Sequence, residues 1–126
     1  MNPESAGLRV NEMNGITRVG FIEQNILDEA NIQQIGDALG ELIDAMDTPK
    51  ILISFADVAH LSSAALGALI TVNNRVGAKK GELRLADIDA KILEVFKITR
   101  LDRLFEIHGT SAEALASGDV DRLRTH

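Results

Sequence analysis

Two adjacent serines, Ser62 and Ser63, are the side chains best placed for chemistry in this chain of 126 residues. They follow the apolar run Lys50–Phe55, KILISF, and a short loop. An apolar, β-branched run of this length predicts a buried strand, and a serine after the loop is a favoured N-cap residue. The pattern therefore predicts a strand-to-helix junction that presents both hydroxyls at the helix N-terminus.

The chemistry expected at such a junction is the holding of an anion or a protein partner. A helix N-terminus carries unpaired N–H groups and a partial positive charge, so a phosphate on a hydroxyl there lies against those donors. The small residues Ala64, Ala65 and Gly67 leave room for a close approach. Simple helix capping is the alternative for these serines, and their spacing alone favours it.

A hydrolase site is a second alternative, because Asp57 and His60 lie in the loop before Ser63. Triad residues come together from distant segments, and no Gly-x-Ser-x-Gly turn is present, so the sequence argues against this site. We expect His60 to be a loop residue near a partner surface. His108 and His126 show no zinc-ligand spacing with it.

Composition narrows the class of protein. The net charge of −6 argues against a nucleic-acid partner, and the absence of cysteine excludes thiolate catalysis and disulfides. No apolar stretch approaches the roughly 18 residues that a membrane-spanning helix needs. The glycines form no nucleotide-binding fingerprint. We therefore expect a cytoplasmic protein with no membrane partner, no cofactor and no metal.

Hydrophobic periodicity predicts the order β-β-α-β-α-β-α-β-α in one domain. The predicted strands cover residues 7–13, 16–22, 50–55, 82–86 and 104–107, and the predicted helices cover 28–46, 63–79, a segment from Asp87 or Asp89 to 96, and 111–116. Asn25 or Asp28 is expected to cap the first helix. An opening hairpin followed by αβ units predicts an α/β fold with a mixed sheet of four or five strands and helices mainly on one face.

The segment Leu61–Gly67, LSSAALG, resembles the serine motif of STAS domains, specifically of bacterial anti-sigma factor antagonists. That family shows an apolar strand, a short loop and an Asp-Ser-Ser/Thr-Gly-Leu-Gly motif that enters a helix. With Leu66 and Gly67 as anchors, Ser63 matches the family's phosphorylated serine, Ser62 replaces its Asp, and Ala65 replaces its Gly. The element order and the closing segment LRLADIDAKILEVFKITRLDRLFEIHGT also resemble the family.

The resemblance implies a single STAS-like domain over residues 7–117, with flexible tails at 1–6 and 118–126. It implies a regulatory binding module and not an enzyme. The unmodified chain would bind an anti-sigma factor, typically a serine kinase, and phosphorylation of Ser63 would release that partner. A serine phosphatase is the further partner that such a cycle implies.

The resemblance also implies which residues contact the partner: Asp28, His60, Leu61, Ser62, Ser63, Ala64, Ala65 and Gly67. Asp28 is the nearest match to a second acidic position of the family, and helix capping is the alternative role for it. Since Ser62 replaces the family's acidic residue, an unphosphorylated interaction or scaffold module stays open as an alternative. So does a nucleotide-binding regulatory domain that uses the same helix end.

Overall fold

The computed structural model describes residues 7–13, 15–21, 25–26, 29–56 and 58–109. Its centre is a five-stranded sheet with the order β1-β2-β4-β6-β7. The strands are β1 (Leu8–Met13), β2 (Ile16–Phe21), β4 (Lys50–Ser54), β6 (Glu82–Ala86) and β7 (Glu106–Ile107). β1 pairs antiparallel with β2, and the other neighbours are parallel, so the predicted mixed sheet is confirmed.

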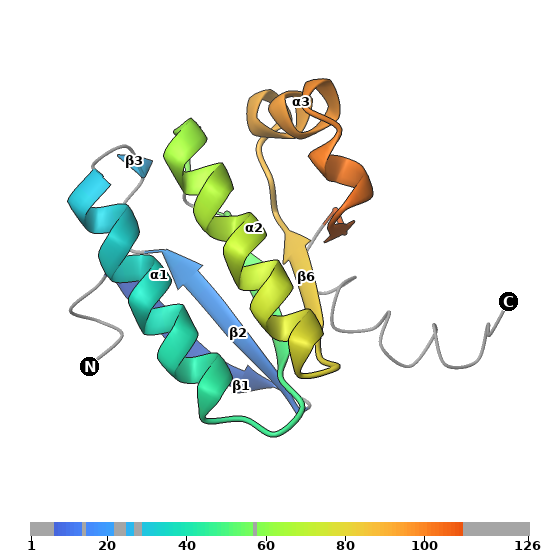
Figure 1. The fold of residues 1–126 in the computed structure, drawn as a ribbon. Helices are drawn as coiled ribbons and strands as arrows, with labels where there is room; N and C mark the ends of the chain where they lie inside the picture. Colours follow the sequence, from blue (N-terminus) through green and yellow to red (C-terminus); the bar gives the residue numbers. More distant parts are fainter. Residues whose placement is uncertain (1–6, 14, 22–24, 27–28, 57, 110–126) are drawn as a thin grey trace, which may run out of the picture.

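Two long helices, α1 (Glu29–Asp44) and α2 (Ser63–Ala78), lie side by side across one face of this sheet (Figure 1). The shorter helix α3 (Ala90–Ile98) and the 3-10 helix η2 (Leu101–Arg103) follow β6. Figure 1 shows α3 beyond the carboxyl end of β6, at the same end of the molecule as the N-terminus of α2. The predicted α/β class, with helices mainly on one face, is confirmed.

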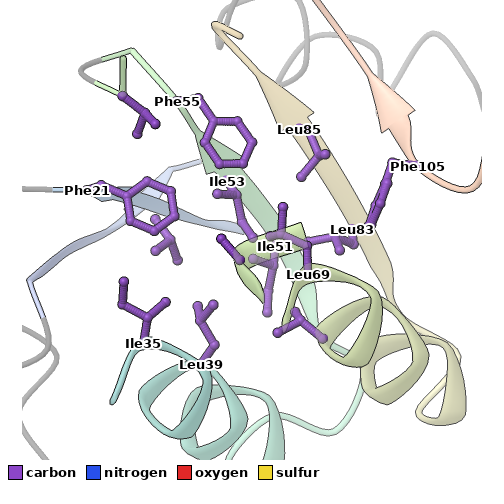
Figure 2. Packing of buried hydrophobic residues seen from close by; sticks show 14 of the residues in the cluster. Phe21, Ile35, Leu39, Ile51, Ile53, Phe55, Leu69, Leu83, Leu85 and Phe105 are labelled. Atoms are coloured by element: carbon purple, nitrogen blue, oxygen red, sulfur yellow. The ribbon is translucent and has the colours of Figure 1, made fainter. Parts of the chain in front are cut away.

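Side-chain alternation along the strands builds the core between the sheet and the helices. Ile51 and Ile53 of β4 point toward α1 and α2, and Leu39 of α1 packs in the same buried cluster (Figure 2). The aromatic contribution is small: the rings of Phe21 and Phe55 stack with centroids 5.5 Å apart. The core is therefore almost entirely aliphatic, and it fixes where each strand delivers the loop that follows it.

A lysine at the C-terminus of α2 also binds the C-terminus of α1. The Lys79 ammonium donates to the carbonyl oxygens of Ile43, Asp44 and Met46 at 3.0, 3.0 and 2.6 Å. These carbonyls belong to the last turn of α1 and the residues after it, where the regular helical hydrogen bonds end. Lys79 therefore joins the two helices at the end of the molecule opposite to the Ser62–Ser63 junction.

Most predicted element boundaries agree with the structure within two residues, and the differences are local. Asp89, not Asp87, caps α3, because its carboxylate accepts from the N–H of Lys91 at 2.8 Å. Leu104 belongs to the turn after η2, so the last strand is shorter than predicted.

Two short strands escaped prediction: β3 (Asn25–Ile26) and β5 (His60–Leu61). They pair in parallel as a separate two-stranded sheet, and two residues are too few to show a period. Because Asn25 lies in β3, it is not the residue that caps α1. Asp28, the predicted helix at 111–116 and the predicted tails lie outside the described residues.

Candidate functional site

The two serines of the junction have different surroundings. Ser62 is the N-cap of α2, and its Oγ accepts from the N–H of Ala65 at 3.1 Å. Its carbonyl oxygen accepts from the N–H of Leu66 at 3.1 Å. The predicted capping role of Ser62 is therefore confirmed.

Ser63 is the first residue of α2, and its side chain is exposed. In the described part of the chain, neither its hydroxyl nor the N–H groups of Ser63 and Ala64 have a hydrogen-bond partner. An open hydroxyl beside open amides is the arrangement in which a phosphate gains donors without displacing any existing contact. The junction thus separates a structural serine from an accessible one.

The exposed residues beside Ser63 have small side chains. Ala64 and Gly67 are exposed, and a Cβ added at Gly67 would meet no atom within 4 Å. Ala65 differs from these neighbours, because it is only 4% exposed and its side chain packs in the core. The predicted partner contacts stay predictions, but the Ala65 side chain is not available for one.

The β3–β5 pair fixes the approach to the junction. Residue 25 pairs with His60, and residue 26 pairs with Leu61. The segments that lead into α1 and α2 therefore run side by side, and His60 is exposed while Leu61 packs partly against the core. The predicted contact residue Asp28 follows β3 in the chain but lies outside the described residues.

A partly buried polar cluster, which the sequence analysis missed, connects the loops that follow β4 and β6. Ser54 is 2% exposed, and its Oγ donates to Asp87 Oδ2 at 2.7 Å and accepts from Arg18 Nη2 at 3.2 Å. Ser54 ends β4 and Asp87 follows β6, so this contact ties together the loops that lead to α2 and α3. A serine at the end of an apolar strand, with an acidic residue after the next strand, is the signal that could have revealed it.

Other chemistries find little support in the described residues. His60 and Ser63 share no hydrogen bond there, and Asp57, the third member of the hydrolase alternative, lies outside them. No cluster of three His, Asp or Glu side chains suited to a metal occurs among them.

Within the same described ranges, no helix combines the length and the apolar content that crossing a bilayer requires.

Comparisons with known proteins agree with this architecture. The sequence model of the STAS domain family matches residues 12–114 of this chain. A Thermotoga neapolitana protein, whose name assigns it to the anti-sigma factor antagonists, is 33% identical over 66 residues, which are 52% of this chain and 58% of that protein. The match therefore spans little more than half of that relative's length.

Solved structures share the fold. An anti-sigma-factor antagonist (STAS) domain protein from Planctomyces limnophilus has a TM-score of 0.79 at 23% identity, over 87% of this chain and 96% of that one. SpoIIAA of Bacillus gives a TM-score of 0.63 in both its unphosphorylated and its phosphorylated form, at 17% and 18% identity. These alignments cover 93% and 92% of this chain and 97% and 98% of those chains. Since the family match covers residues 12–114, which include every element from β2 to β7 and all three α-helices, the chain belongs to the STAS domain family.

Proposed function

We propose that this chain is an anti-sigma factor antagonist that works in the cytoplasm by partner switching. The observation that carries the proposal is the open hydroxyl of Ser63 in the first turn of α2, next to a cap that Ser62 alone supplies. The family membership and the name of the Thermotoga neapolitana relative support the same role. The partner is an anti-sigma factor that is also a serine kinase, and a serine phosphatase resets the cycle.

The switch itself is electrostatic. Ser63 Oγ forms the new bond to the γ-phosphorus of ATP as the bond to the β-phosphate oxygen breaks, and the hydroxyl proton passes to a base of the kinase. The phosphate adds a charge of about −1.5 to −2 to a surface of small, uncharged side chains. A partner that fits this surface then meets an uncompensated charge and dissociates. This chain contributes the nucleophile, and the kinase contributes the base and the metal.

Phosphate transfer to one serine is the direct test. The chain is incubated with each anti-sigma kinase of its source organism and Mg-ATP, and mass spectrometry locates the phosphate. We expect modification of Ser63 in the natural chain and none in Ser63→Ala, while Ser62→Ala, the matched neighbour, is still modified. Phosphate only at other residues, or partner release by Ser63→Ala that equals that of the natural chain, would contradict the proposal.

The scaffold alternative rests on Ser62, which replaces the family's acidic residue. Serine and aspartate are both good N-caps, so the replacement keeps the cap and removes only a negative charge. If the kinase requires that charge, the natural chain stays unmodified and Ser62→Asp is phosphorylated at Ser63. If both chains stay unmodified and still bind the partner, the domain is a constitutive interaction module.

A further inference from the structure

The exposed apolar surface of the molecule is concentrated on α3 and η2. In the part of the chain that the structure describes, the exposed large hydrophobic side chains are Val95, Ile98 and Leu104, at 39%, 73% and 44%. Val95 and Ile98 are three residues apart on α3 and therefore share a helix face. Leu104 directly follows η2, which packs against α3. Single exposed apolar residues are ordinary, but a cluster rimmed by charges marks an interaction surface.

A groove connects this cluster to the serine junction. It has a volume of about 370 Å³, and it runs between the segment before α2 and the start of α3. Its lining residues are Ala59, His60, Leu61, Lys91, Ile92 and Val95. Val95 belongs to both the groove and the apolar cluster, and Leu61 precedes the N-cap of α2. Figure 1 shows α3 and the N-terminus of α2 at the same end of the molecule.

On α3 and η2, between the flanking carboxylates of Asp89 and Glu106, cationic side chains outnumber acidic ones. Residues 90–105 carry four cationic and two acidic side chains, a formal charge of +2, in a chain of net charge −6. All six of these charged side chains are exposed. Lys91 and His60 face the groove, and no carboxylate lines it among the described residues. The surface therefore favours a ligand that is apolar in the middle and acidic at its edges.

We infer that α3, η2 and the groove form the second half of the docking surface that begins at Ser63, and that its occupant is an amphipathic helix of the partner with carboxylates beside its apolar stripe. The inference rests on the proposed function for the identity of the partner. Apolar residues of that helix cover Val95 and Ile98, and its carboxylates face Lys91. Ser63 lies two residues after Leu61 of the groove, so a phosphate on it adds negative charge that opposes the carboxylates.

A pair of synthetic peptides tests the surface without any kinase. Both peptides have about 18 residues, enough for a helix, and the same leucine stripe, and the flanking positions are Glu in one and Lys in the other. NMR of the isotopically labelled chain records the amide signals during titration. We expect the acidic peptide to shift the signals of Lys91, Val95 and Ile98, and the basic peptide to bind about tenfold or more weakly, since like charges now meet.

Matched variants assign the effect to the surface. Ile98→Ser and Lys91→Glu should each weaken the acidic peptide about tenfold, the loss typical of removing one central contact. Lys80→Glu changes an exposed lysine at the far end of α2 and should leave binding unchanged. Equal binding of the two peptides, shifts confined to other surfaces, or no shift at all would overturn the inference. A dimer of the chain that Ile98→Ser abolishes would assign the surface to a second copy instead, which also overturns it.

The peptide-binding test and the phosphorylation test can fail independently of each other. If the peptide binds but no kinase modifies Ser63, the surface stands and the proposed switch fails. If a kinase modifies Ser63 and binds Ile98→Ser as tightly as the natural chain, the switch stands and the surface fails.

Discussion

Ser62 and Ser63 are adjacent in the chain, yet one is committed to the backbone and the other is open to solvent. The Ser62 hydroxyl accepts from the Ala65 N–H, while Ser63 points its side chain outward from the first turn. The family's aspartate at the first position would make the same capping contact. The replacement of this aspartate by Ser62 therefore costs the fold little and removes only a charge from the candidate site.

Alanine substitutions at the two serines should have different effects on stability. Ser62→Ala removes the cap and should lower the free energy of unfolding by about 1 kcal/mol. Ser63→Ala removes an exposed hydroxyl without a partner and should change it by less than about 0.5 kcal/mol. Urea denaturation followed by circular dichroism measures both values. Equal losses for the two variants would mean that Ser63 also takes part in the cap.

At the scale of elements, α2 carries glycines that its own packing does not require. A Cβ at Gly67 or Gly77 would meet nothing within 4 Å, and both residues are exposed. Gly81, just after the helix, is different, because a Cβ there would overlap the carbonyl oxygen of Pro49. The close approach of Pro49 explains Gly81, whereas packing explains neither Gly67 nor Gly77.

The matched pair Gly67→Ala and Gly77→Ala separates folding from binding. Each change should raise the free energy of unfolding by about 0.5–1 kcal/mol, because alanine is favoured over glycine inside a helix. Gly67 lies one turn from Ser63 on the same face, so its new methyl should weaken binding of the partner kinase. The Gly77→Ala variant, whose change lies near the other end of α2, should bind the kinase with normal affinity. Calorimetric titration with the kinase measures affinity, and equal affinities for the two variants would remove Gly67 from the docking surface.

At the scale of the whole molecule, the candidate site lies at one end of a framework of one sheet and the two helices that cover it (Figure 1). The sheet and the helices α1 and α2 share one buried cluster, and Lys79 closes it at the end opposite to Ser63. The loops after β4 and β6 are joined through Ser54 and Asp87. A charge added at Ser63 therefore acts on a surface whose supports are fixed on both sides.

Phosphorylation of Ser63 should leave the fold unchanged. The α2 N-terminus favours the negative charge by about 0.3–1 kcal/mol, so the modified chain should be slightly more stable. We expect amide NMR shifts confined to β5, the first turn of α2 and the start of α3, with an unaltered circular dichroism spectrum. Shifts that extend through β1 and β2 would contradict a purely electrostatic switch.

The sequence by itself determined the features that depend on local spacing. Hydrophobic periodicity placed β6 correctly to the residue and predicted the β1–β2 hairpin, and the N-cap preference of serine predicted the start of α2. Capping, turn formation and amphipathic periodicity involve residues only a few positions apart, so they can be predicted from the chain alone. The family motif added Ser63 as the candidate site.

Only the tertiary structure decided which distant segments meet. The β3–β5 pair, the Ser54–Asp87 hydrogen bond and the capping of α1 by Lys79 each join residues more than thirty positions apart. The same holds for the groove, which brings His60 beside Lys91, and the burial of Ala65 follows from how α2 packs on the core. Such contacts depend on how the elements pack, and no local pattern encodes them, so the sequence identified the serine while the fold built the surface around it.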